Sequence, residues 1–172
     1  MTADRRTRRG AIPLEEEGFT LIELMVVVLI IGILIAIALP TFLGARTRAQ
    51  NRAAQSDLRN ALVAAKTMYT DNSSYAAADS SATGLFTVEP SLCYAAAATA
   101  STIGGACVTG QGAANISVSA AAAEWAAARM SASTTCYWID ETAASGTTYG
   151  STAVAANCTG TDALAAAATQ FP

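Results

Sequence analysis

The sequence predicts an α+β protein in which one long N-terminal helix packs on a small antiparallel β-sheet. Two observations support this fold class: an apolar run at residues 19–39 continues as an amphipathic stretch to residue 71, and short β-rich segments recur after residue 72. The C-terminal part, about 100 residues, is long enough for one small domain. We therefore expect a helix over 19–71 and a β-rich domain over 72–172.

The apolar run is a candidate membrane span. It contains 21 residues, and Glu23 is its only ionisable group. At 1.5 Å per residue such a helix is long enough to cross a bilayer core of roughly 30 Å. A carboxylate at membrane depth is disfavoured by about 2.5 kcal/mol or more, so Glu23 requires a partner that explains its presence.

A charged segment precedes the run. It contains arginines followed by acidic residues, and Gly18 stands directly before the first apolar residue; the charged residues are Asp4, Arg5, Arg6, Arg8, Arg9, Glu15, Glu16 and Glu17. Clustered arginines keep this end of the chain in the cytoplasm. An ordinary secretory signal cut after the small residues at 36–38 is an alternative, as is a twin-arginine signal, but the run is longer than a usual signal core.

Beyond Pro40 the pattern becomes that of an amphipathic helix. Leu58, Leu62, Ala65 and Tyr69 recur at spacings of four, three and four, which places them on one helix face. A continuous helix over 19–71 would be about 80 Å long. One half must therefore be covered by the domain and the other by lipid or by further copies of the chain.

Three arginines, Arg46, Arg48 and Arg52, follow the apolar run before the first acidic residue after Glu23. One interpretation is contact with nucleic acid or anionic lipid. The other, which we favour, is a solvated helix face that pairs with acidic groups of neighbouring subunits. No nucleic-acid partner is required.

The C-terminal part is rich in Ala, Ser, Thr and Gly and low in charge. Runs of four alanines at 95–98, 120–123 and 165–168 are helical by propensity, but their surroundings favour strands. The segments NISVSA and TCYWID show alternation and β-rich composition, and the ambiguous EWAAARMSAS between them is interpreted as a strand. We expect three or four antiparallel strands covering the second half of the helix.

The four cysteines, Cys93, Cys107, Cys136 and Cys158, allow three disulfide connectivities. All four follow the apolar run, on the exported side, where disulfides persist. We favour Cys93 with Cys107 and Cys136 with Cys158, because each pair closes a short local loop. The chain has no histidine and no C-x-x-C spacing, which argues against a zinc site.

Catalytic patterns are not found in the sequence. Without histidine there is no histidine-based triad or general base, and the adjacent Asp140 and Glu141 would point to opposite faces of a strand. Gly104 and Gly105 do not have the spacing of a phosphate loop. We therefore predict a protein that is not an enzyme and uses no cofactor.

The segment GFTLIELMVVVLIIGILIAIALP, from Gly18 to Pro40, resembles the N-terminal signature of type IV pilins and the related pseudopilins. The signature, a class III signal, has a glycine, then a phenylalanine, then a glutamate five positions after the glycine. The resemblance implies a pilin-like fold and a leader, residues 1–18, that a prepilin peptidase removes on the cytoplasmic face. It also implies N-methylation of the new terminus at Phe19.

The resemblance gives Glu23 a partner. After cleavage the α-amine of Phe19 is a cation, and in an assembly the amine of one subunit meets Glu23 of its neighbour. In a low dielectric such a pair is favoured over two separate charges. Glu23 snorkelling to the headgroups is the alternative. Pro40 and Gly32 are expected to kink or loosen the helix, since in this family the stretch between them often unwinds on assembly.

The function implied is that of a structural subunit of a type IV pilus-like surface filament serving adhesion, motility or DNA uptake. The precursor would reside in the cytoplasmic membrane, and its partners would be other copies of itself, the prepilin peptidase and methyltransferase, and the pilus assembly machinery. Alternatives are a pseudopilin of a type II secretion system and a monomeric membrane-anchored adhesin or binding module, which would not need Glu23.

Overall fold

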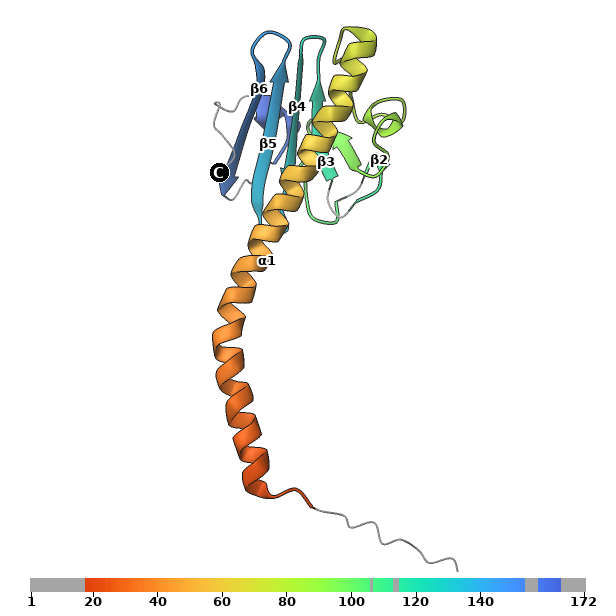
Figure 1. The fold of residues 1–172 in the computed structure, drawn as a ribbon. Coiled ribbons are helices and arrows are strands. Elements are labelled where there is room, and N and C mark those ends of the chain that lie inside the picture. The colour runs from red at the N-terminus through yellow and green to blue at the C-terminus, as the bar shows by residue number, and fades with distance from the viewer. Residues whose placement is uncertain (1–17, 106, 113–114, 154–157, 165–172) are drawn as a thin grey trace, which may run out of the picture. The chain divides into compact units, whose positions relative to one another are not determined.

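The computed structural model describes residues 18–105, 107–112, 115–153 and 158–164. It is an α+β fold that divides into two compact units, residues 1–42 and 43–172. Figure 1 shows the elements in chain order. The predicted leader with its arginines, apart from Gly18, and the alanine run at 165–168 lie outside the described residues.

Helix α1 spans Leu21–Asn72 and has Pro40 within it. Among the described residues it is the one helix long and apolar enough to cross a membrane, as judged by length and composition. The predicted bounds, 19–71, are close to those observed. The second half of α1 belongs to the compact unit that begins at Leu43, so the helix is shared between the two units.

The sheet contains six strands in the order β2-β1-β3-β4-β5-β6. Their bounds are β1 Cys93–Ala96, β2 Thr109–Gly110, β3 Asn115–Ala120, β4 Glu124–Met130, β5 Thr135–Thr142 and β6 Gly146–Ala153. The expectation of three or four strands was too low, and the sheet is not wholly antiparallel, because β1 and β3 run parallel. The three strands predicted from NISVSA, EWAAARMSAS and TCYWID are β3, β4 and β5.

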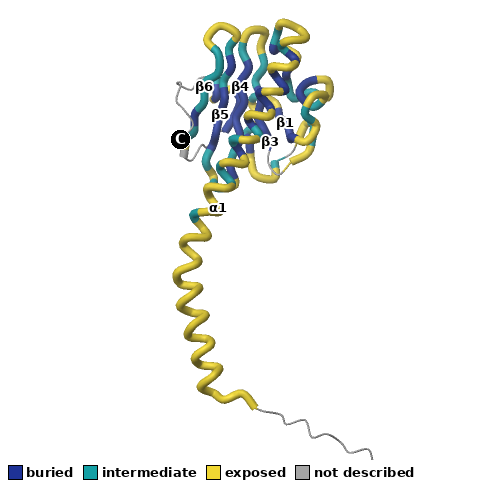
Figure 2. The backbone as a smooth tube through the Cα atoms, viewed as in Figure 1, coloured by how far each residue is buried: buried dark blue, intermediate teal, exposed yellow. Residues whose placement is uncertain are grey.

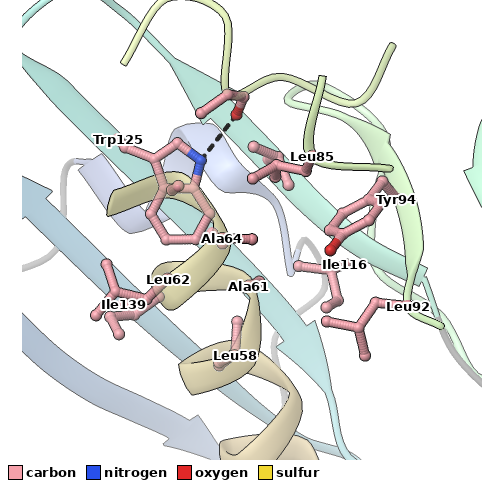
Figure 3. Close-up of a cluster of buried hydrophobic side chains, with 14 of the residues drawn as sticks. Leu58, Ala61, Leu62, Ala64, Leu85, Leu92, Tyr94, Ile116, Trp125 and Ile139 are labelled. Atoms are coloured by element: carbon pink, nitrogen blue, oxygen red, sulfur yellow. Dashed lines mark hydrogen bonds between the residues drawn. The ribbon is translucent and has the colours of Figure 1, made fainter. Parts of the chain in front are cut away.

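The main core lies between the second half of α1 and one face of the sheet (Figure 3). Leu58, Leu62 and Ala65 of the predicted helix face are buried there, and Tyr69 packs at its edge. Trp125 of β4 is fully buried, and its indole N–H donates a hydrogen bond to the carbonyl of Ala78 at 2.9 Å. Packing therefore holds α1 and the loop after it to the same strand.

Two ion pairs also connect α1 to this face of the sheet. Arg129 of β4 pairs with Asp57, and Lys66 pairs with Glu141 of β5 at 3.1 Å. Burial lowers the pKa of Arg129 and raises that of Asp57, while the attraction between them opposes both shifts. Asp57 and Lys66 are about 13 Å apart along the helix axis, so the two pairs set the position of α1 along the strands.

The opposite face of the sheet has a smaller cluster beneath the short helix α2, Gly160–Leu164. Trp138 lies there directly over Gly150 of β6, since a Cβ at that glycine would meet the indole ring at 1.9 Å. Asp140 and Glu141 lie on opposite faces of β5, as expected from strand geometry. Glu141 contacts α1, whereas Asp140 does not.

The cysteines form two disulfides, Cys93–Cys107 and Cys136–Cys158. The first connects β1 to the loop before β2. The second connects β5 to the segment that enters α2, so it fastens that segment to the second face of the sheet. Each encloses a short loop, and in the chain-entropy model a loop of this size adds about 3 kcal/mol to the stability.

We predict that non-reducing peptide mapping of the exported protein yields the peptide pairs Cys93 with Cys107 and Cys136 with Cys158. Because all four cysteines are in disulfides, the unreduced protein should show no thiol that reacts with an alkylating agent, before or after denaturation. A peptide that joins Cys93 to Cys158, or free thiols after denaturation, would contradict the pairing.

Candidate functional site

The N-terminus of α1 is closed by a reciprocal pair of side chains, Thr20 and Glu23. The backbone N–H and the hydroxyl of Thr20 donate to Oε2 of Glu23 at 2.9 and 2.6 Å. The N–H of Glu23 in turn donates to the Thr20 hydroxyl oxygen at 3.3 Å. This is a capping box, which satisfies backbone donors that the first helical turn leaves unpaired.

The capping box leaves part of the carboxylate available. Both Thr20 donors use Oε2, and Oε1 has no hydrogen-bond partner within the described residues. Glu23 is therefore held in one orientation by its own helix while an exposed oxygen remains for a further donor. Sequence reasoning recognised Glu23 but missed Thr20, although the T-x-x-E spacing that signals a capping box is visible in the sequence.

The first half of α1 has an apolar surface on every side. No described residue between 18 and 43 is buried, as the colouring in Figure 2 shows, and Phe19 is 84% exposed. A helix that is hydrophobic all round is stable in water only when something covers it. A surface of this extent marks contact with a membrane or with other protein chains.

Gly32 and Pro40 lie within this surface. A Cβ at Gly32 would meet nothing within 4 Å, so no contact within the described chain requires glycine there. Pro40 has no N–H, which leaves the carbonyl of Ala36 without its usual donor. The helix nevertheless continues through both residues, and next to the proline the Thr41 hydroxyl donates to the carbonyl of Ala38 at 2.9 Å.

The arginines that follow the apolar surface lie in the unit of residues 43–172. Arg48 and Arg52 line a groove of about 230 Å³ with three polar or aromatic residues, Asn51, Gln55 and Tyr137. Neither arginine forms an ion pair with a described residue. The groove lies between α1 and β5 and carries positive charge.

Comparison with known proteins identifies the N-terminal segment. Residues 15–39 match the family model of the prokaryotic N-terminal methylation motif. The type IV major pilin protein PilA of Myxococcus xanthus is 45% identical to the chain over 58 residues, which are 34% of this chain. The N-terminal segment of the chain is therefore similar to that of type IV pilins, including the class III signal.

A second relative extends this finding. The type IV wide pilus major component PilA4 of Thermus thermophilus is 42% identical over 59 residues, again 34% of this chain. The chain spans 26% of the length of the first relative and 45% of the second. No solved structure matches. The matched methylation motif includes Gly18, Phe19, Glu23 and Gly32, and Pro40 follows it directly.

Proposed function

We propose that the chain is a structural subunit of a type IV pilus-like surface filament. The observation that carries the proposal is the N-terminal methylation motif on a helix whose large apolar side chains are exposed. In the membrane, lipid covers this surface before assembly. In a filament, the same surface is covered by the helices of other copies, so one segment serves both states.

In this proposal residues 1–18 are the leader, residues 19–71 the helix and residues 72–172 the head domain. A prepilin peptidase cuts between Gly18 and Phe19, and a methyltransferase modifies the Phe19 amine. The precursor lies in the cytoplasmic membrane, with residues 19–39 as the span, and the mature subunit passes to the surface through the pilus assembly machinery.

Glu23 then serves two successive roles. In the single chain it caps its own helix through Thr20. In the filament its free Oε1 accepts the Phe19 amine of a neighbouring subunit, which pairs two charges that would otherwise stay alone among apolar side chains. Because methylation leaves the amine protonated, the pairing survives the modification.

Gly32 and Pro40 complete the assembly segment. A helix lacking one backbone hydrogen bond at Ala36 and a side chain at residue 32 needs less free energy to open locally than a regular apolar helix. We therefore expect the helix to unwind partly between Gly32 and Pro40 on assembly. This would let neighbouring helices pack along the filament.

Replacement of Gly18 by leucine is expected to block processing, because the peptidase must accommodate a small residue at this position. The substitution leaves the fold unaffected, since a Cβ at Gly18 meets nothing within 4 Å. Immunoblotting should show the precursor alone, and N-terminal sequencing should find residues 1–18 still attached.

Gly18→Ala is the matched control, because alanine is small and should allow cleavage. Efficient processing of Gly18→Leu would contradict the assignment of the cleavage site. A mature terminus at Leu39 in the unaltered chain would establish an ordinary secretory signal instead.

A further inference from the structure

The compact unit of residues 43–172 carries opposite charges at its two ends. One end, which we call the basic end, holds Arg46, Arg48 and Arg52 at the start of this part of α1. The other, which we call the acidic end, holds Asp71 in the last turn of α1 and Glu124 at the start of β4. None of these five residues forms an ion pair within the described chain.

The fold places Asp71 and Glu124 at the same end. The chain that leaves α1 returns to the turn between β3 and β4, where the N–H of Tyr75 donates to the carbonyl of Ala122 at 3.1 Å. Glu124 follows that turn directly. Figure 1 shows the end of α1 and the turns joining β3 to β4 and β5 to β6 at one end of the sheet.

The basic end lies where β4 ends and β5 begins. Tyr137, near the start of β5, lines the groove with Arg48 and Arg52. In the register of the sheet Tyr137 lies opposite Arg129 of β4. The guanidinium of Arg129 binds Asp57, which lies about one and a half turns after Arg52 on α1. Along α1 the distance from Arg52 to Asp71 is about 28 Å. This exceeds the Debye length of about 8 Å at physiological ionic strength, so the two ends of one copy cannot neutralise each other.

The acidic end also concentrates negative charge. Asp140 shares the sheet face of Glu124, and its Oδ1 is buried without a hydrogen-bond partner. Burial, together with the charges of Glu124 and Glu141, raises the pKa of Asp140 to about 6. A cation brought to this end from outside would relieve the repulsion among these carboxylates.

We propose that the heads of two copies dock end to end, with the arginine groove of one copy on the Asp71 and Glu124 end of the next. This rests on the proposed filament function and assigns its head-to-head contact. A lipid surface would neutralise the basic end and leave the acidic end unpaired, whereas a second copy neutralises both. An end-to-end contact is heterologous, and a contact of that type that does not close into a ring propagates as a filament.

The test uses the full chain in a cell that assembles it. One variant reverses the basic end, Arg48→Glu with Arg52→Glu, and a second reverses the acidic end, Asp71→Lys with Glu124→Lys. Each alone should lower the yield of sheared filaments at least about tenfold, because like charges across an interface cost more than the ~1.4 kcal/mol that corresponds to this factor. Disulfide mapping of each variant verifies that the head has folded.

Restoration is the decisive step. A chain with all four substitutions should regain filaments, because its ends are again complementary. Producing the two variants together should also regain them, with both chains present in the sheared material, since each supplies the end that the other lacks. Neither result follows from a lipid contact or from a local folding defect.

Wild-type yield from either variant alone would overturn the docking proposal and leave the filament function standing. A loss that neither the four-substitution chain nor co-production restores would also overturn it, and would assign the arginines to lipid or to another protein. Absence of this chain from filaments of unaltered cells would refute the filament function and the docking contact with it.

Discussion

Replacement of Glu23 by alanine is expected to reduce surface filaments to a small fraction of the wild-type yield while cleavage and membrane insertion continue. Insertion should be unchanged or improved, because a charge is removed from the apolar segment. Assembly should fail, because the Phe19 amine of each incoming subunit loses its partner. Leaving one member of a buried pair alone costs about 3–5 kcal/mol, which corresponds to more than a hundredfold in an equilibrium.

Two further variants separate the contribution of the capping box from that of the Glu23 charge. Glu23→Gln retains the geometry that caps α1 but removes the charge, so its yield should fall between those of wild type and Glu23→Ala. Thr20→Val removes the Thr20 hydroxyl that bonds Glu23 and keeps the carboxylate, so it should cost about 1 kcal/mol of helix stability and leave assembly mostly intact. Immunoblots for processing and counts of sheared filaments measure both steps.

The order of these yields separates the two roles of Glu23. Filament yield from Glu23→Ala equal to that of wild type would show that the carboxylate is only tolerated, which would favour a membrane-anchored adhesin. A failure of Thr20→Val as severe as that of Glu23→Ala would show that the cap, and not the charge, is what assembly requires.

Replacement of Trp125 by alanine is expected to destabilise the head by about 3–5 kcal/mol, the range for removing a large aromatic side chain from a core. Trp125 is fully buried against α1, and its indole is the hydrogen-bond donor to Ala78. Urea unfolding of the full chain in detergent, with the disulfides intact, measures the change. Trp138, the second tryptophan, is the fluorescent reporter.

Two control variants define the cause. Trp125→Phe keeps most of the apolar contact but leaves the Ala78 carbonyl without its donor, so a smaller loss of about 1–3 kcal/mol is expected. Val63→Ala on α1 removes a side chain that is 64% exposed and should change the stability little. A midpoint for Trp125→Ala equal to that of Val63→Ala would contradict the packing of α1 on β4.

Strong local patterns in the sequence predicted α1 and the three central strands. The 3.6-residue spacing of Leu58, Leu62 and Ala65 gave the buried helix face, and alternation around Ile116 and Val118 gave β3. Strand β6 lacks this signal, because its sequence GTTYGSTA has few large apolar residues and a glycine, Gly150, that makes room for Trp138.

The parallel pairing of β1 with β3 also could not be predicted from local sequence patterns. Strand β1 is short and ends within an alanine run, and its neighbour is chosen by contacts between distant parts of the chain. The same holds for Arg129 and Asp57, whose pairing depends on how α1 crosses the sheet. Glu23, in contrast, stood out because a lone carboxylate in an apolar run is costly anywhere in a protein.

The most direct test of the central claim is the N-terminus of the subunit in the filament. Sheared filaments should contain this chain as a subunit, and mass spectrometry should find that it begins at Phe19 with one added methyl group on the amine. A chain that remains in the membrane as a monomer with residues 1–18 attached, or one that begins at Leu39, would contradict the account.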